Sequence, residues 1–495
     1  MADESWTGGY VVDVEYTHGY YPDLAPLNLA MAASLAGRKV LDPDQPFTYL
    51  ELGCGNGFSS ALLAAANPQG QFWANDFNPA HIANARATAQ AASIDNVIFL
   101  EASFEELAET EMPDFDIIAL HGIWSWVSPE NRHYIIELIR RRLKAGGLVF
   151  ISYNCLPGWS RVAPLRRLLK LGVTNMAAPA EARVEQAFSY ARAMRDAGAG
   201  FFTGAPHVGA ILDHLAKQDR AYLAHEYLND QWGLFYQDEV ADALLPAKLS
   251  FLASARLMDG FDQFNLTPGQ QAMLNLPGAP SASQVVRDFL LDRRFRRDLY
   301  GRRVPGLAST DISAWFARRR FALARPRSNC PLKFKAPGGE FDLTPKVFDA
   351  VLDALVDGPE ILEALSSRSG LVALERRHLE QAVGVLCALD YVHPALSSDG
   401  DARRRVATDR FNHAALRSAL AGRPVAALAS PVTGCGVPLP PSEQVFLAAI
   451  VNGQAPEAMV QGLAPGTGSE QAEMRQRALR FQQEELPVLK SLQVV

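Results

Sequence analysis

The residues most able to do chemistry form a glycine-rich loop between two acidic residues. Residues 50–57 read L-E-L-G-C-G-N-G, and Asp76 ends a second apolar run nineteen positions after Gly57. Glycines let a backbone pass close to a ligand, and an acid at the tip of a second strand can bind the two hydroxyls of a ribose. The spacing predicts the first half of a nucleoside-binding βαβ unit. A tight turn without a ligand is the minor alternative.

The form of the loop separates two nucleoside cofactors. Dinucleotide-binding loops read G-x-G-x-x-G and direct a helix N-terminus at a pyrophosphate. Here the third glycine, Gly57, comes one residue early, and Glu51 stands just before the first glycine, Gly53. A carboxylate at that position repels a pyrophosphate but can receive a cationic amino group. S-adenosylmethionine has an α-amino group, a sulfonium and no phosphate, so the loop favours this cofactor over NAD.

The E-x-G-x-G-x-G sequence of residues 51–57 resembles the first motif of class I methyltransferases. In that family the turn after the third strand lies along the adenine, which points to Ser103 and Phe104, although the family often has Asp where Ser103 stands. The resemblance implies methyl transfer from S-adenosylmethionine rather than hydride transfer. The candidate cofactor-binding residues of the sheet edge are Glu51, Gly53, Cys54, Gly55, Asn56, Gly57, Asp76, Phe77, Ser103, Phe104 and His121.

Alternating apolar runs and helix-like stretches must position these residues. Further strands are expected at 96–100, 115–120 and 148–152, and a helix at 129–144 ends at Gly146-Gly147. Two more strands, at 221–228 and 249–257 around a helix at 238–245, would complete a seven-stranded sheet. The predicted fold is therefore α/β and Rossmann-like, with ligands at the carboxyl ends of the strands. Other helices are expected at 161–171, 180–197 and 208–218, the last two forming an insertion.

Two loops at this sheet edge are rich in aromatic residues. Residues 121–127 read H-G-I-W-S-W-V, and residues 153–159 read Y-N-C-L-P-G-W. Aromatic faces tolerate a sulfonium and hold an ammonium by cation–π attraction. Ordinary packing is an equal alternative for each ring alone, and His121 or Tyr153 is a hypothetical proton acceptor. The predicted acceptor pocket and catalytic side chains are His121, Trp124, Trp126, Tyr153, Asn154 and Trp159.

Composition limits the class of protein. A chain of 495 residues predicts roughly three domains, and a net charge of −7 argues against a general nucleic-acid binder. The five cysteines include no C-x-x-C pair, and no run of about 18 apolar residues occurs. His225-Glu226-Tyr227-Leu228-Asn229 lacks the second histidine of a zinc-binding H-E-x-x-H motif. We therefore expect a soluble cytoplasmic protein without a metal ion or stable membrane insertion.

The chain divides into four expected parts. Residues 1–260 form the cofactor-binding domain, whose insertion at about 172–219 is a possible dimerisation element. Residues 261–330 form a basic, mostly helical segment; thirteen Arg and Lys lie between 291 and 335. A solvated helix surface is the leading interpretation of that charge, and a docking surface for an acidic partner is the alternative. Residues 331–400 suggest a winged-helix-like domain and 401–495 a small C-terminal domain.

Three later segments narrow the resemblance. Residues 224–229 (A-H-E-Y-L-N), 293–300 (R-R-F-R-R-D-L-Y) and 429–434 (A-S-P-V-T-G) resemble bacterial methyltransferases with a methyltransferase regulatory domain. That group includes the rickettsial outer-membrane-protein lysine methyltransferases. The resemblance implies a homodimer whose middle and C-terminal domains engage a protein substrate, and it implies that Tyr16, Tyr20 and Tyr21 cap the cofactor. The alternatives are a small-molecule or polysaccharide acceptor and a non-catalytic scaffold.

Overall fold

The computed structural model of the chain describes residues 19–174, 176–274, 276, 284–343, 345–463 and 468–495. Of the predicted site residues, Tyr16 lies outside this set. No helix within the described ranges is both long and apolar enough to cross a lipid bilayer.

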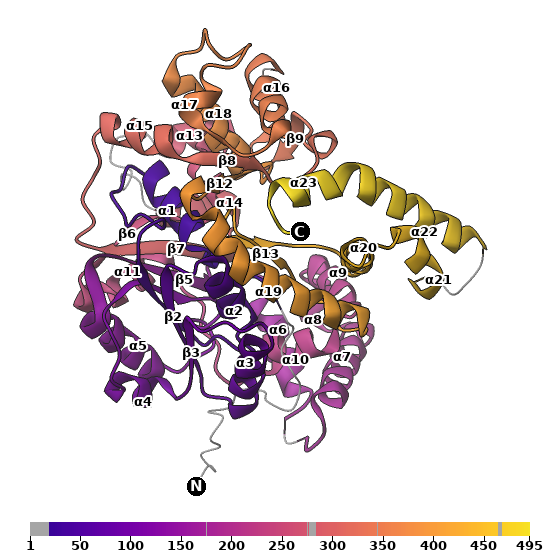
Figure 1. Cartoon of the computed structure of the whole chain (residues 1–495). Coiled ribbons are helices and arrows are strands. Elements are labelled where there is room, and N and C mark those ends of the chain that lie inside the picture. The colour runs from indigo at the N-terminus through magenta and orange to yellow at the C-terminus, as the bar shows by residue number, and fades with distance from the viewer. Residues whose placement is uncertain (1–18, 175, 275, 277–283, 344, 464–467) are drawn as a thin grey trace.

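A seven-stranded sheet forms the centre of the molecule (Figure 1). Its order is β3-β2-β1-β4-β5-β7-β6, with β1 to β5 parallel and β7 antiparallel to both of its neighbours. The predicted seven-stranded, Rossmann-like sheet is confirmed. The strands are β1 (Phe47–Leu52), β2 (Gly70–Asp76), β3 (Val97–Glu101), β4 (Phe115–Leu120), β5 (Leu143–Asn154), β6 (Leu249–Ser254) and β7 (Phe295–Arg302).

Helices cover both faces of the sheet, as an apolar run in a parallel strand requires. In β4, Ile117 and Ala119 join the core on one face, while Ile118 and Leu120 join the core on the other. The first face is covered by α1 (Pro26–Leu35), α2 (Phe58–Ala66) and α3 (Pro79–Ala91); the second by α4 (Phe104–Glu109), α5 (Pro129–Arg142) and α11 (Gln237–Ala243).

One of the expected strands is a helix. The prediction of a strand at 221–228 was wrong, because these residues belong to α10 (Arg220–Leu228). The Asp219 side chain caps that helix by accepting a hydrogen bond from the Tyr222 backbone N–H at 2.9 Å. The buried Leu223, Ala224, Tyr227 and Leu228 follow a helical spacing rather than a strict alternation.

The seventh strand instead comes from the segment expected to be basic and helical. In β7, Arg296 is 3% exposed and donates hydrogen bonds to Asp288 at 2.6 Å and to Asp298 at 2.9 Å. The neighbouring Arg297 forms an ion pair with Asp23 at 2.9 Å. Because each buried guanidinium has a carboxylate partner, an Arg-rich run can occupy an interior strand. The sheet therefore extends to residue 302, past the expected boundary at 260.

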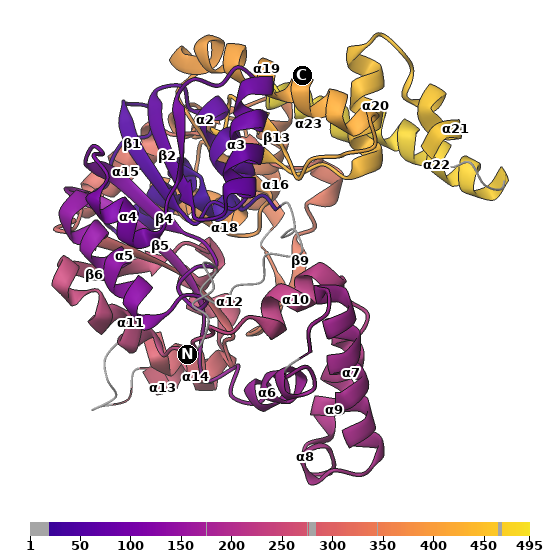
Figure 2. The ribbon, with the colours of Figure 1, turned by 90° about the horizontal axis from the view of Figure 1, so that it is seen from below.

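The helical insertion projects from the sheet as a separate lobe (Figure 2). Its core contains Leu165, Phe188 and Leu212. The helices predicted at 161–171, 180–197 and 208–218 are confirmed to within a few residues, whereas dimerisation through this lobe stays a prediction. The lobe consists of α6 (Ala163–Leu171), α7 (Ala180–Asp196), α8 (Gly200–Thr203), α9 (Pro206–Leu215) and α10.

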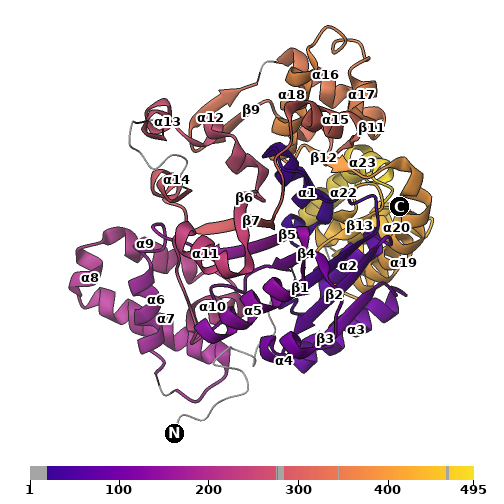
Figure 3. The same cartoon turned by 90° about the vertical axis from the view of Figure 1, so that its left-hand side faces the viewer.

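A second lobe has its own small antiparallel sheet (Figure 3). The sheet contains β8 (Arg320–Leu323), β11 (Glu360–Ile361) and β12 (Val392–Ala395), so it begins before the expected boundary at 331. A winged-helix-like character of this lobe stays a prediction. Its helices are α15 (Ser309–Arg318), α16 (Pro345–Ala354), α17 (Leu362–Leu365) and α18 (Arg376–Ala388). The chain between β6 and this lobe also forms α12 (Asp262–Asn265), α13 (Pro268–Leu274) and α14 (Gln284–Leu291), and a hairpin follows β8, with strands β9 (Lys333–Ala336) and β10 (Gly339–Asp342).

The C-terminal part packs directly against the helix that follows the glycine loop. Leu62 of α2 shares one hydrophobic core with Phe411, Val432 and Phe446. This part is therefore continuous with the core of the sheet. It contains α19 (Asp401–Leu420), a hairpin of β13 (Leu428–Ser430) and β14 (Cys435–Val437), α20 (Pro441–Val451), α21 (Val460–Leu463), α22 (Gly468–Arg480) and α23 (Leu486–Ser491).

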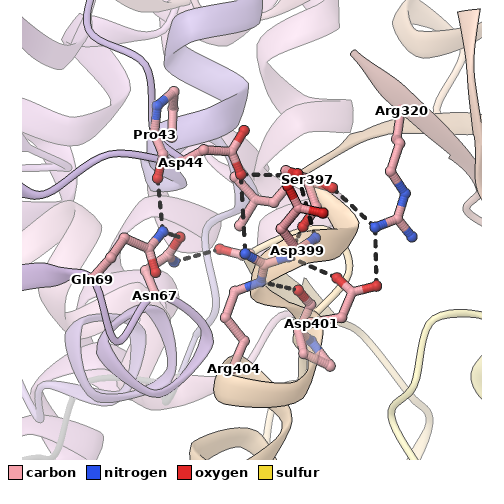
Figure 4. A network of polar contacts seen from close by, with 12 residues as sticks. Pro43, Asp44, Asn67, Gln69, Arg320, Ser397, Asp399, Asp401 and Arg404 are labelled. Atoms are coloured by element: carbon pink, nitrogen blue, oxygen red, sulfur yellow. Dashed lines mark hydrogen bonds and ion pairs between the residues drawn. The ribbon is translucent and has the colours of Figure 1, made fainter. Parts of the chain in front are cut away.

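Buried polar contacts fix the three parts to one another (Figure 4). The Asp44 carboxylate, just before β1, accepts hydrogen bonds from Arg319 at 2.7 Å and from the Ser397 backbone N–H at 2.7 Å. Arg404 of α19 donates to Asp401 at 2.7 Å, and Asp401 also accepts from Arg320 of β8 at 2.9 Å. The N-terminal sheet, the second lobe and the C-terminal part thus meet in one charged network.

Candidate functional site

Three glycines shape the loop between β1 and α2. Gly53, Gly55 and Gly57 have φ values of 70°, 54° and 66°, in the left-handed region that favours glycine. A Cβ at Gly53 would overlap Ile123, and one at Gly57 would overlap Ala85, but one at Gly55 would meet nothing within 4 Å. Gly55 therefore borders open space on the side of the loop where a side chain would otherwise stand.

Several amides of this loop donate hydrogen bonds within the protein. Asn75 accepts from Gly53 N–H through its side chain at 3.4 Å and from Cys54 N–H through its carbonyl at 2.8 Å. Gly57 N–H donates to the Cys54 carbonyl at 3.0 Å. A loop that binds pyrophosphate keeps such donors for the anion. The loop therefore fits the phosphate-free cofactor that the sequence favours.

Asp76 ends β2 beside the loop, and its carboxylate is 7% exposed. One oxygen accepts from Gly55 N–H at 2.9 Å. The other accepts from Asn78 N–H at 2.9 Å and lies 3.2 Å from His81 Nδ1. A carboxylate has about four acceptor positions, so three protein partners leave one for a ligand hydroxyl. The half-buried Phe77 follows directly.

Glu51 is buried at the end of β1 and accepts a hydrogen bond from the Ser60 hydroxyl of α2. Burial raises the pKa of Glu51 to about 7, and the negative charge of Asp76 adds to that rise. Near neutral pH the carboxylate is therefore balanced between its two forms, and a nearby cation would favour the ionised one. The sequence did not indicate Ser60, because nothing in its type marks it as a partner of Glu51.

His121 follows β4 and lies against the ring of Tyr21, with ring centroids 3.8 Å apart. The Ser152 hydroxyl accepts from Gly122 N–H at 2.8 Å and lies 3.3 Å from His121 Nδ1. Burial and the nearby Arg297 lower the pKa of His121 to about 3. His121 is a neutral imidazole, and this environment argues against its role as a general base.

The residues expected beside an adenine are engaged in local structure. Ser103 caps α4: its hydroxyl accepts from Glu106 N–H at 3.2 Å, and its own N–H donates to the Glu106 carboxylate at 2.8 Å. Phe104 is half-buried in the first turn of the same helix. In the glycine loop, Asn56 accepts from the Asn84 amide at 3.1 Å. Contacts of these side chains with a cofactor stay predictions.

Two of the predicted acceptor-pocket rings come together around an arginine. The guanidinium carbon of Arg166 lies 4.5 Å from the ring centroid of Trp232 and 5.9 Å from that of Trp126. Trp159 packs edge-on against Trp232 at 5.4 Å. Arg166 also donates to the Asn229 carbonyl at 2.6 Å. We call Trp126, Trp159, Arg166 and Trp232 the tryptophan–arginine cluster. The sequence did not predict Arg166 and Trp232, because only the fold brings α6 and residue 232 beside the loop that follows β4.

Three other predicted catalytic residues belong to the protein interior. Trp124 is 1% exposed and packs within the core on the α4–α5 face. The Tyr153 hydroxyl donates to Asp298 at 2.7 Å, and the Asn154 backbone N–H donates to the Ser125 hydroxyl at 2.9 Å. Tyr153 is 1% exposed and its ring belongs to the core on the α4–α5 face, so its place in an acceptor pocket stays a prediction.

Of the two described N-terminal tyrosines, Tyr20 and Tyr21, Tyr21 lies at this site. The Tyr20 hydroxyl instead accepts from Gly436 N–H in β14 at 2.6 Å. Within the described residues, His, Cys, Asp and Glu form no group of three that could hold a metal ion.

The sequence matches two described families. One is a methyltransferase domain, over residues 44–221, and the other is a predicted methyltransferase regulatory domain, over residues 219–302. An uncharacterized protein of Synechocystis, sll1526, is 38% identical over 502 residues, which cover 99% of this chain and 99% of its own. An uncharacterized protein of Rickettsia prowazekii, RP789, is 27% identical over 58% of this chain and 51% of its own length.

Solved structures share the whole architecture. PKMT2 from Rickettsia typhi superposes with a TM-score of 0.68 at 18% identity, covering 96% of this chain and 99% of its own. The same protein in complex with AdoHcy superposes with a TM-score of 0.66, covering 90% of this chain and 91% of its own. A likeness at 18% identity shows that this chain and PKMT2 share a fold.

Proposed function

This chain belongs to the class I S-adenosylmethionine-dependent methyltransferases that carry a methyltransferase regulatory domain, and from that premise we propose that it methylates a lysine amine of a protein. The observation that carries the proposal is the tryptophan–arginine cluster. Arg166 is 5% exposed; the nearby carboxylates of Glu226 and Asp230 stabilise its positive charge electrostatically, while its described contacts are with aromatic rings and backbone carbonyls. Aromatic faces and backbone carbonyls contact this cation directly, so the surroundings suit an ammonium as well. The fold shared with PKMT2 supports the same acceptor class.

The bound cofactor supplies a methyl carbon on a positively charged sulfonium. Asp76 would hold the ribose hydroxyls of the cofactor, and Glu51 would receive its α-ammonium group. The neutral His121 adds no positive charge beside a sulfonium. A lysine amine with a reference pKa of ~10.4 must lose a proton first, which costs roughly 4 kcal/mol near pH 7.5. The positive sulfonium beside the acceptor and desolvation of the ammonium lower that pKa, so the proton can pass to solvent water without a dedicated base.

The raised pKa of Glu51 predicts a pH-dependent cofactor affinity. The free protein takes up a proton at Glu51 below pH 7, whereas an ammonium-bearing ligand requires the carboxylate. The affinity for S-adenosylhomocysteine should therefore rise by up to about tenfold between pH 6 and pH 8. Without ligand, the folding stability that Glu51 contributes changes with pH in the opposite direction to the ligand affinity. This contribution is fully present below pH 4.5 and is lost as the pH rises through 7. Calorimetry across this range measures the first effect.

Glu51→Gln is the matched variant for that experiment, since it keeps the shape and a hydrogen-bond acceptor for Ser60. Its affinity should be low and nearly constant between pH 6 and pH 8. His121, with a pKa of about 3, does not titrate in this window. A wild-type affinity that is flat with pH, or a Glu51→Gln variant that keeps the wild-type slope, contradicts the assignment of Glu51 to the ammonium.

The acceptor proposal is tested by incubating the enzyme with methyl-labelled S-adenosylmethionine and fractionated extract of the source cells. The expected result is label on protein, recovered as methyllysine after acid hydrolysis, and no label with the cofactor-defective Asp76→Ala variant. Label only in low-molecular-weight material, or in polysaccharide, overturns the lysine proposal and favours a small molecule or a sugar. We further propose a cytoplasmic homodimer that binds neither nucleic acid nor membrane; light scattering of the purified chain tests its mass.

A further inference from the structure

A short N-terminal segment is held by three elements of the fold at once. In residues 19–24, the Tyr20 hydroxyl accepts from Gly436 N–H at 2.6 Å. Asp23 pairs with Arg297 of β7 at 2.9 Å. The Leu24 carbonyl accepts from the Tyr49 hydroxyl of β1 at 3.1 Å. The segment therefore joins the C-terminal hairpin to two strands of the central sheet.

The contact with the hairpin is closely fitted. A Cβ at Gly436 would lie 2.7 Å from the Tyr20 ring, so only glycine leaves room for that ring. Burial raises the pKa of Tyr20 well above its ordinary value, which keeps the phenol neutral and able to accept from Gly436. The hairpin itself is anchored, because the Asn67 side chain donates to the Gly434 carbonyl at 2.7 Å. Asn67 follows α2, the helix that begins at the glycine loop.

The next residue along the segment reaches the cofactor site. Tyr21 lies on the His121 ring at 3.8 Å, while Tyr20 points to β14. Two adjacent side chains thus connect the C-terminal hairpin with the wall of the site formed by His121. Because a single peptide link joins the two residues, the position of Tyr20 restricts where the Tyr21 ring can lie.

We propose that the β13–β14 hairpin is a positioning element of the cofactor site, acting through Tyr20 on the Tyr21–His121 pair. Cofactor affinity then depends on a hydrogen bond made at Gly436, a residue of the C-terminal part that is itself outside the glycine loop and the strand ends. This inference concerns the cofactor alone and does not rest on the proposed lysine acceptor.

The test compares two tyrosine-to-phenylalanine variants of the full chain. Tyr20→Phe removes the hydroxyl that accepts from Gly436. Tyr391→Phe removes a hydroxyl that donates to the Pro331 carbonyl at 2.8 Å in the second lobe, and it serves as the matched control. One net hydrogen bond corresponds to about a fivefold change in an equilibrium constant, so Tyr20→Phe should weaken S-adenosylhomocysteine binding by up to about fivefold in calorimetry. Tyr391→Phe should bind like the wild type.

A second measurement reports the geometry without activity. The ring-proton shifts of His121, observed by NMR with labelled histidine, should move in ligand-free Tyr20→Phe and stay unchanged in Tyr391→Phe. Gly436→Ala, which crowds the Tyr20 ring, should move the same signals. Wild-type affinity together with unchanged His121 shifts in both Tyr20→Phe and Gly436→Ala overturns the proposal. Equal weakening by Tyr20→Phe and Tyr391→Phe overturns it as well, because the effect would then be general destabilisation.

Discussion

Replacing Asp76 with alanine is expected to weaken S-adenosylhomocysteine binding about a hundredfold. The variant loses a charged acceptor for the ribose hydroxyls and leaves Gly55 N–H and Asn78 N–H without their partner. Hydrogen bonds to charged groups contribute about 1.5–3 kcal/mol each, and two orders of magnitude in Kd correspond to about 2.7 kcal/mol. Titration calorimetry of the purified chain measures the change.

Asp116→Ala is the control for that prediction. The Asp116 carboxylate also has protein partners: it accepts a hydrogen bond from Thr48 N–H at 2.8 Å and forms an ion pair with Lys144 at 2.8 Å. It lies near the start of β4, whereas Asp76 lies at the end of β2, so the two carboxylates stand at opposite edges of a parallel sheet. Binding should survive in Asp116→Ala. Binding that survives equally in a folded Asp76→Ala variant would show that Asp76 does not hold the ribose.

Replacing Asp298 with alanine should produce the largest loss of stability. Asp298 is fully buried and accepts hydrogen bonds from Arg296 at 2.9 Å and from the Tyr153 hydroxyl at 2.7 Å. Its removal leaves the Arg296 guanidinium, 3% exposed, short of negative charge. Breaking a buried ion pair on one side costs about 3–5 kcal/mol. Urea unfolding, followed by tryptophan fluorescence, should show the transition moving to lower urea.

The double variant Arg296→Met/Asp298→Leu separates charge from packing. Replacing both members of a buried pair with apolar residues is often neutral, and Asp288 keeps its ion pair with Arg293 at 3.2 Å, so this variant should recover part of the lost stability. The exposed Asp311 of α15 provides a matched surface control, and Asp311→Ala should unfold like the wild type. If Asp298→Ala also unfolds at the wild-type urea concentration, the buried network contributes nothing to stability.

Local sequence was enough to locate the strands and the loop that hold the cofactor. β4 coincides with the predicted range of 115–120, since it is an apolar run that ends at a turn. The left-handed φ angles at Gly53, Gly55 and Gly57 explain why the loop could be read from residue types alone. The role of β7 could not be predicted in this way. Its charges are compensated by Asp23, Asp259 and Asp288, which only the folded chain brings near.

The acceptor side was predicted less well, and for a related reason. Trp126 and Trp159 were expected there, but their shared neighbours Arg166 and Trp232 come from other parts of the chain. Tyr153 was expected beside these tryptophans because it begins the segment 153–159, which ends at Trp159. Its hydroxyl is instead on Asp298 of β7, a strand that the sequence placed in a helical segment. The helix expected in place of β7 therefore concealed the buried partner of Tyr153.

The position of β7 also bears on how the protein is made. β5 pairs with β7 through seven consecutive residues, from Leu148 to Asn154, on the side away from β4. A ribosome that has just released Asn154 must add roughly 150 further residues before the partner strand is complete, which takes about 7–30 s at about 5–20 residues per second. During that time the nascent chain presents a long apolar strand with a free edge, the kind of surface that invites aggregation. Newly synthesised copies should therefore depend on molecular chaperones more than a protein whose sheet closes in sequence order.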